Sequence, residues 1–515
     1  MKKLLFLFLV AGVAACNPNE NATETGQNTN SDVLVRKTQL IQGPSGPAYK
    51  PEAVSQMTID IEMRDHDFKW ENQDIQLVWS ATKMTGLLAV GYQPAGFTNI
   101  DKRISTINIH SAEWKNVHDA LIARVLKTMS TKMGRDMTAS EIISEDHAVL
   151  PQIIFKVTDP DVLTDLLNLE NVRYAEPYGY YPLTADAGNV INSSSGCSGS
   201  SYSLNAADYT TITPGCKQSW NYTNVNIPAA WNSYHGENIK IGVIDAGISS
   251  TQPLLNAQFN SGSSSGRTIT TGYTYSNSAY TTCAHGSSMC GLAAGPRNSL
   301  GNACGVAYQS NLYFIRACND VVLDESAELS GVRNALIAMG NTVDLNIISM
   351  SVGTPFSSSV LRDGVNYASG KGKLIFAAAG TSFSWTSWWG VIYPAAYSGC
   401  VAVTGVKESG STCYDCHDGS QVRITIPMER NTNSNRTSVS LPVNGNNPTY
   451  VGGSSCATAI TAGIAALVWS AKPTLTAAQV LDCIYRTSQY YPTLTGTHGY
   501  GNPNAAAACA LAATL

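Results

Sequence analysis

Three side chains with complementary chemistry stand far apart in the sequence, each beside a stretch that predicts a strand end or a helix start. Asp245 follows an apolar, strand-like run, His285 precedes a run of small residues, and Ser455 comes just after two glycines and opens a small, apolar, helix-like run. A serine can attack a carbonyl carbon while a histidine takes its proton and an aspartate orients the imidazole. Taken singly, each residue also has a structural interpretation as a turn residue, a core histidine or a helix cap.

The elements expected to position these residues are apolar strands that alternate with helical patterns. The strand-like runs cover residues 239–244, 312–317, 345–352, 373–379 and 400–406. Between two of them, Leu329, Val332, Leu336 and Met339 recur at helical spacing, and we expect that helix to end at Gly340. This alternation predicts an α/β fold whose mostly parallel sheet is covered by helices on both faces. In such sheets, reactive groups collect where strands end and the following helices begin.

The chain order Asp245, His285, Ser455 is the order of subtilisin and differs from that of chymotrypsin and the α/β-hydrolases. Further similar stretches are residues 225–231, 350–353, 393–394 and 500–505. From about residue 220 to residue 512, the chain therefore resembles a subtilase catalytic domain. The resemblance implies a subtilisin-like fold and a peptide or protein substrate. It also implies that Ser455 is the nucleophile, His285 the general base and then acid, and Asp245 the carboxylate that orients the imidazole.

One departure from the family pattern concerns the oxyanion site. Subtilases usually place an asparagine after the Ala-Ala-Gly that ends the fourth strand, whereas this chain has Thr381 there. The backbone N–H of Ser455 would remain a donor, and the Thr381 hydroxyl is the candidate second donor. Losing one such donor costs on the order of 100- to 1000-fold in rate, so the sequence is compatible with a slow protease or with an inactive one.

The resemblance also implies a substrate-binding edge at Ser351, Val352 and Gly353. Ile392 would lie at the base of the first specificity pocket, where the family generally has glycine. Because the added side-chain volume would narrow that pocket, we expect a small residue such as alanine or serine on the acyl side of the scissile bond.

The N-terminus has the pattern of an export signal. Two lysines precede an apolar run that reaches Cys16, and residues 13–16 resemble a bacterial lipobox. By that resemblance, residues 1–15 are a lipoprotein signal peptide, Cys16 is lipidated and residues 16–56 are a polar tether, so we expect an exported membrane lipoprotein. The alternative is an ordinary signal peptide with an incidental cysteine.

Residues 57–183 have a pattern of their own that predicts a small α+β domain. Strand-like runs cover residues 104–109 and 151–157, and helix-like runs cover residues 111–129 and 161–169. Residues 152–181 resemble the second half of the inhibitory propeptides that precede subtilases, although a generic accessory domain is the alternative. Residues 184–218 then read as a Ser/Gly-rich linker before the catalytic domain at 219–515. We expect propeptide cleavage in this linker, which would leave any lipid on Cys16 with the propeptide.

The cysteines leave several possibilities open. Thirteen cysteines minus the lipidated one allow up to six disulfides in an oxidising compartment. Residues 413–417 match a c-type haem attachment pattern, which a local disulfide between Cys413 and Cys416 explains as well. Cys290 and Cys456, both expected near the triad, are either inert buried thiols or partners in a disulfide. No cofactor is clearly implied and no metal ligands can be named, although calcium is frequent in the family.

The amino-acid composition argues against nucleic-acid binding as a function. The net charge of -5 and the charged fraction of 13% give no electrostatic basis for binding nucleic acid. The leading hypothesis is an exported serine endopeptidase, made as a zymogen, whose partners are its substrate, its own propeptide and a membrane reached through the lipid. The alternative is a catalytically weak or inactive subtilase-like lipoprotein that binds peptides through the cleft.

Overall fold

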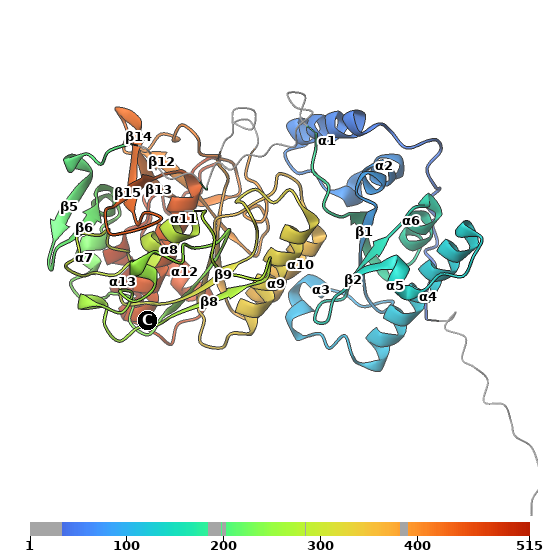
Figure 1. Ribbon diagram of the computed structural model, residues 1–515, viewed down its shortest axis with the longest axis horizontal. Coiled ribbons are helices and arrows are strands. Elements are labelled where there is room, and N and C mark those ends of the chain that lie inside the picture. Colours follow the sequence, from blue (N-terminus) through green and yellow to red (C-terminus); the bar gives the residue numbers. More distant parts are fainter. Residues whose placement is uncertain (1–32, 184–196, 198–201, 284, 382–389) are drawn as a thin grey trace, which may run out of the picture.

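The computed structural model describes residues 33–183, 197, 202–283, 285–381 and 390–515. The described chain forms two domains that lie side by side, an N-terminal domain of residues 33–183 and a C-terminal domain of residues 202–515 (Figure 1). Cys16 lies outside the described residues.

The N-terminal domain is an antiparallel sheet covered by helices on one face. Its strand order is β2 (Ile143–Asp146), β3 (Gln152–Lys156), β1 (Leu87–Tyr92) and β4 (Val172–Pro177). Its helices are α1 (Pro51–Asp65), α2 (Ile75–Thr85), α3 (Ile100–Arg103), α4 (Ala112–Met133), α5 (Ala139–Ile142) and α6 (Pro160–Leu167). The α+β prediction is therefore confirmed, as are the two helix-like runs and the second strand.

The first predicted strand of this domain, at residues 104–109, is wrong. Residues Ile104–Thr106 form a short 3-10 helix, and the sheet instead uses β1, which the sequence pattern did not indicate. Ile104 packs with Leu150, Ile337 and Tyr367, so its burial comes from contact with the other domain and not from strand pairing.

The C-terminal domain is built on a nine-stranded sheet in the order β15-β14-β13-β12-β11-β10-β7-β9-β8. The strands are β7 (Lys240–Asp245), β8 (Ile269–Tyr273), β9 (Asn311–Arg316), β10 (Ile347–Met350), β11 (Leu374–Ala378), β12 (Val401–Lys407), β13 (Val422–Arg430), β14 (Asn433–Ser440) and β15 (Thr449–Val451). Pairing is parallel from β13 to β8, and β14 and β15 are antiparallel additions at one edge. All five predicted strands and the mostly parallel α/β fold are confirmed.

Alternate residues of the strands face opposite layers of helices. Val243 and Phe376 face a first layer of helices, whereas Ile244 and Ile375 face a second layer on the opposite side of the sheet. The first layer holds α8 (His285–Ala294), α11 (Gly453–Ala471), α12 (Ala477–Arg486) and α13 (Ala505–Ala513), with α7 (Ile227–Ala230) beside α13; the second holds α9 (Ser326–Asn341) and α10 (Ser359–Gly370).

Gly340 has a different role from the expected helix end. Helix α9 continues through it to Asn341, and a Cβ at residue 340 would lie 3.3 Å from the Cα of Ala368 on α10. The glycine therefore permits the close packing of α9 on α10.

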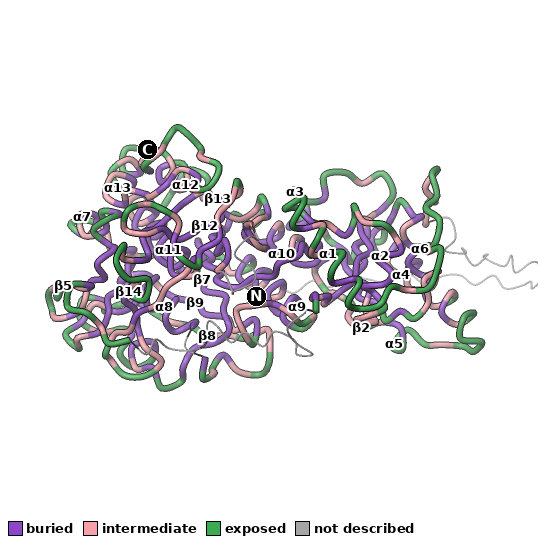
Figure 2. The backbone as a smooth tube through the Cα atoms, turned by 90° about the horizontal axis from the view of Figure 1, so that it is seen from above, coloured by how far each residue is buried: buried purple, intermediate pink, exposed green. Residues whose placement is uncertain are grey.

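Helix α11 is buried along most of its length (Figure 2). Within the described residues it is the one helix long and apolar enough to cross a membrane, and 83% of its most apolar window is buried inside the protein. It is thus accounted for as the core helix beneath the sheet. The predicted capping box of Thr476 and Gln479 is present at the start of α12.

The boundaries of the domains differ from the expected ones at two places. Residues 33–50, expected to be a polar tether, pack on the N-terminal domain, where the Val35 N–H donates to Asn171 Oδ1 at 2.8 Å. Part of the expected linker forms the hairpin β5 (Tyr209–Ile212) and β6 (Cys216–Ser219) of the C-terminal domain. Asp208, just before it, is fully buried and accepts hydrogen bonds from Arg430 and Arg436, which explains why this polar stretch is ordered.

The two domains meet where the open face of the antiparallel sheet lies against α9 and α10. Ala89, Ile154 and Tyr174 of that sheet belong to the same apolar core as these helices. At the centre, Arg173 donates to both carboxylate oxygens of Asp363 at 2.8 and 2.9 Å. Asp363 also accepts hydrogen bonds from Tyr174 and Gln152 and is fully buried. A desolvated ion pair with its remaining lone pairs satisfied therefore joins the domains.

Candidate active site

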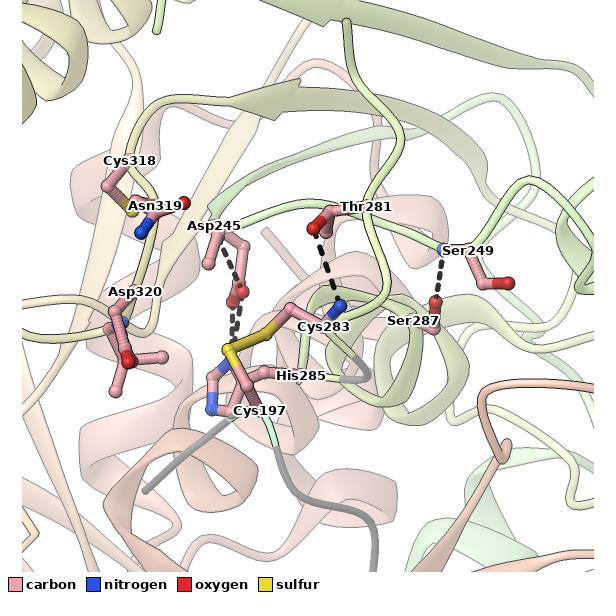
Figure 3. Close-up of a disulfide and its surroundings, with 12 residues drawn as sticks. Cys197, Asp245, Ser249, Thr281, Cys283, His285, Ser287, Cys318, Asn319 and Asp320 are labelled. Atoms are coloured by element: carbon pink, nitrogen blue, oxygen red, sulfur yellow. Dashed lines mark hydrogen bonds and ion pairs between the residues drawn. A yellow bond between two sulfur atoms is a disulfide. The ribbon is translucent and has the colours of Figure 1, made fainter. Parts of the chain in front are cut away.

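Two of the three predicted catalytic residues are joined by hydrogen bonds in the structure. Asp245 is the last residue of β7 and His285 is the first residue of α8. His285 Nδ1 lies 2.9 Å from each carboxylate oxygen of Asp245, which is fully buried (Figure 3). With Nδ1 donating to the carboxylate, Nε2 is left as the basic nitrogen.

Burial lowers the pKa of His285, but the charge of Asp245 and its hydrogen bond raise it by more, so the net pKa lies above the usual value. The more distant Asp320 contributes in the same direction. The carboxylate therefore favours the protonated imidazole, which is the state that forms when a histidine takes a proton from a serine.

Ser455, the third residue of α11, lines the same cavity as His285. Gly453 has φ +81° and gives the sharp turn before it, as the glycine pair predicts. In the described part of the chain no hydrogen bond reaches Ser455 Oγ, and unliganded active sites often tighten such contacts only when substrate binds. The N–H of Ser455 belongs to the first turn of α11, where backbone donors have no intrahelical partner.

Thr381 lies beside this turn. Its Oγ1 is 3.2 Å from Ser454 Oγ, which also accepts the Gly380 N–H at 3.2 Å. A Cβ on Gly453 would lie 2.7 Å from the Thr381 hydroxyl oxygen, so that oxygen is close to the backbone that leads into Ser455. The Thr381 hydroxyl can donate toward an oxyanion with this contact intact when Ser454 is the donor, whereas it must give up or share the contact when Thr381 is the donor.

The cavity has a volume of about 430 Å³, and all the predicted substrate-binding residues line it. These are Ser351, Val352, Gly353 and Ile392, together with Thr381, His285 and Ser455. Ser351 Oγ donates to the Ser455 carbonyl at 3.2 Å. The Ile392 side chain packs so closely on Gly353 that a Cβ there would lie 2.5 Å from Ile392 Cδ1, which agrees with a narrow pocket.

The backbone of Gly353 is not a free edge in this structure. Its N–H donates to the Val321 carbonyl at 2.9 Å, and its carbonyl accepts the Leu323 N–H at 2.8 Å. An incoming peptide must therefore displace the Val321–Leu323 segment or pair elsewhere in the cavity. The sequence did not reveal this pairing, because it joins two irregular segments.

Further cavity residues come from parts of the chain for which the sequence predicted no role in this site. They are Tyr202, Val321, Val322, Cys413, Asp415, Met428, Glu429, Ser434, Asn435, Thr437, Tyr450 and Val451, in addition to backbone near the predicted motifs. Asp415 sits in the turn closed by the Cys413–Cys416 disulfide, which is the local bridge considered as the alternative to haem attachment. Cys416 pairs with Thr381 through an isolated β-bridge, so this turn lies beside the candidate oxyanion residue.

The other cysteines show which of the open alternatives holds. Cys290 and Cys456 are buried and not bonded to each other, and burial raises the pKa of each thiol, as expected for inert core thiols. A second disulfide joins Cys197 to Cys283, two residues before His285 (Figure 3). Two of the six possible bridges are thus formed among the described residues. No group of three or more His, Cys, Asp or Glu side chains in the described ranges is arranged to hold a metal ion.

Comparison with known proteins identifies the family. The family model described as the subtilase family matches residues 236–502. The chain is 34% identical over 260 residues to subtilisin E of Bacillus subtilis (strain 168), a match covering 50% of this chain and 62% of that protein, and it is 34% identical over 260 residues to a subtilisin of Bacillus pumilus, covering 86% of it. The protein belongs to the subtilase family.

Solved structures also resemble the chain. A protease of Pseudoalteromonas arctica PAMC 21717 matches with a TM-score of 0.47 at 23% identity, over 57% of this chain and 96% of that one.

We predict that Asp245→Asn lowers kcat/KM by about 10⁴-fold, because the imidazole loses both its orientation and the charge that stabilises its protonated form. Because Asp245 raises the pKa of His285, we expect the acid limb of the wild-type pH–rate profile above the usual histidine pKa, and it should move to lower pH in the variant. Measuring kcat/KM from pH 5 to 9 tests both effects. An unmoved acid limb in the variant would show that another group controls the profile.

We predict that Thr381→Asn raises kcat by on the order of 100-fold, because the longer amide can reach a developing oxyanion without giving up a hydroxyl contact. Thr381→Val, which keeps the shape and removes the hydroxyl, should lower kcat. Both should leave KM nearly unchanged, since the interaction forms only in the transition state. Equal kcat values for all three proteins would place residue 381 outside the oxyanion site.

Proposed function

We propose that this protein is a serine endopeptidase that hydrolyses peptide bonds through Asp245, His285 and Ser455. The observation that carries the proposal is the buried Asp245–His285 pair at the wall of a cavity that Ser455 also lines. The oxyanion donors would be the Ser455 N–H and the Thr381 hydroxyl. Membership of the subtilase family supports the same chemistry.

The N-terminal domain serves, in this proposal, as an inhibitory propeptide, so the protein is made as a zymogen. The contact between its sheet and helices α9 and α10 supports this role, as does the buried Arg173–Asp363 pair between the domains. Cleavage in the linker before Cys197 would remove the covalent connection between the two domains. The sequence at Cys16 supports export with a lipid anchor, which cleavage would leave on the N-terminal side.

A second candidate function is peptide binding without efficient catalysis. Two observations favour it: the Thr381 hydroxyl already contacts Ser454, and both backbone groups of Gly353 are already hydrogen-bonded. Such a protein would bind a peptide partner in the same cavity without cleaving it efficiently.

We expect a fluorophosphonate probe to label Ser455 covalently in the processed wild-type protein, because the activated hydroxyl attacks phosphorus as it attacks a carbonyl. Ser455→Ala should lose both the labelling and the processing of the linker, as followed by intact mass. Ser434→Ala, which changes another serine of the cavity, is the matched control and should be labelled like the wild type. Absence of labelling after removal of the N-terminal domain would favour the binding scaffold, and processing that persists in Ser455→Ala would rule out self-cleavage.

We also expect the wild type to prefer alanine or serine over leucine on the acyl side of the cleaved bond, because Ile392 fills the pocket against Gly353. Ile392→Gly should raise kcat/KM for leucine relative to alanine by about 10-fold or more, because the enlarged pocket can accommodate the additional methyl and methylene groups of the leucine side chain. Cleavage of a peptide library, read by mass spectrometry, measures this ratio. Efficient wild-type cleavage after leucine but not after alanine would contradict it.

A further inference from the structure

The chain that follows the N-terminal domain is fixed covalently at the active site. Cys197 forms a disulfide with Cys283, 86 residues later in the sequence. Cys283 is buried and lies two residues before His285, and Figure 3 shows the bridge beside the Asp245–His285 pair. A linker residue is therefore bonded to the segment that carries the catalytic histidine.

The same stretch is also held on its C-terminal side. The Asn205 N–H donates to the Tyr450 hydroxyl at 2.9 Å, and Tyr450 lines the cavity that contains Ser455. Asp208 is fully buried, and its carboxylate oxygens accept hydrogen bonds from the guanidinium groups of Arg430 and Arg436 at 2.7 to 2.9 Å. Separating this segment from the domain would leave a buried carboxylate and two arginines without their partners, which is costly.

Tyr202 lies between these two attachments and lines the same cavity as Ser455 and His285. Tyr202 is 55% exposed, so an incoming molecule can contact part of this residue. Tyrosine offers a flat apolar surface with a polar tip at little conformational cost, which suits it to recognition.

We propose that Cys197 and residues 202–205 remain part of the catalytic chain, at the cleft, after maturation and that Tyr202 helps select peptides with an aromatic or aliphatic side chain near the scissile bond. This inference rests on the proposed proteolytic function. It requires that maturation cut the chain between Leu183 and Cys197. That step breaks one C–N bond and consumes one water molecule, and it leaves the Cys197–Cys283 bond unchanged.

The position of the cut has a visible covalent consequence. A cut before Cys197 frees the N-terminal domain and keeps Cys197 on the catalytic chain. A cut after Cys197 would leave the N-terminal domain attached to the catalytic domain through the disulfide. We therefore expect the processed full-length product, denatured without reductant, to separate into the same two chains that it gives after reduction, with masses that differ only by the two hydrogen atoms that each reduced disulfide gains. A single species that falls apart only with reductant would overturn the inference.

The role of Tyr202 is tested by Tyr202→Ala, with Tyr273→Ala as the matched control because Tyr273 is also 55% exposed but lies outside the cavity lining. In a peptide library, Tyr202→Ala should lose about 3- to 10-fold in kcat/KM for the best wild-type peptide that carries an aromatic or aliphatic flanking residue. Tyr202→Phe should keep most of the preference, and Tyr273→Ala should match the wild type.

The disulfide is tested by the paired change Cys197→Ser and Cys283→Ser, which should weaken the same preference because Tyr202 loses one of its two attachments. Fluorophosphonate labelling of Ser455 distinguishes a failure of this inference from a failure of the proposed function. Labelled protein whose Tyr202→Ala variant keeps the wild-type preference overturns this inference alone, whereas unlabelled wild-type protein overturns the proposed function itself.

Discussion

The structure depends on how closely two helices of small residues can approach the same sheet. Helix α11 lies under β10, β11, β12 and β13 and packs against α8, so it fixes where Ser455 stands relative to His285. A Cβ on Gly463 would lie 2.5 Å from the Val306 side chain, and one on Gly286 would lie 2.3 Å from the Gly247 carbonyl. Larger residues at either place would push a helix outward. Because interiors are packed as densely as crystals, such a displacement would move a catalytic side chain away from the cavity.

The proximity of the three candidate catalytic residues could be predicted from sequence because each is tied to an element with a strong local signal. The end of β7 and the starts of α8 and α11 follow from apolar runs, small residues and glycines, and parallel strands bring such points to one edge. Asp245 and His285 meet there, and Ser455 lines the same cavity. Their relation to one another follows from sheet topology, which the alternation of strands and helices already implies.

Other features could not be predicted because they depend on contacts between segments without a periodic pattern. Residues 104–109 look like a strand, but Ile104 is buried against α9 and α10. Gly340 looks like a helix end, but it lies within α9 and permits the close packing of α9 on α10. The pairing of Gly353 with Val321 and Leu323, and the place of Tyr202 in the cavity, arise from irregular chain. The linker near Asp208 was expected to be exposed because its composition is polar, and its order comes from arginines more than 200 residues away.

The buried pair of Arg173 and Asp363 has a consequence for the conditions under which the two domains part. Dissolved ions screen charges that face water, but they have little access to a pair enclosed by Tyr174, Gln152 and two helices. The contribution of this pair to the attraction between the domains should therefore be nearly independent of ionic strength. This contact would therefore hold the two domains together about equally well in dilute and in saline solution.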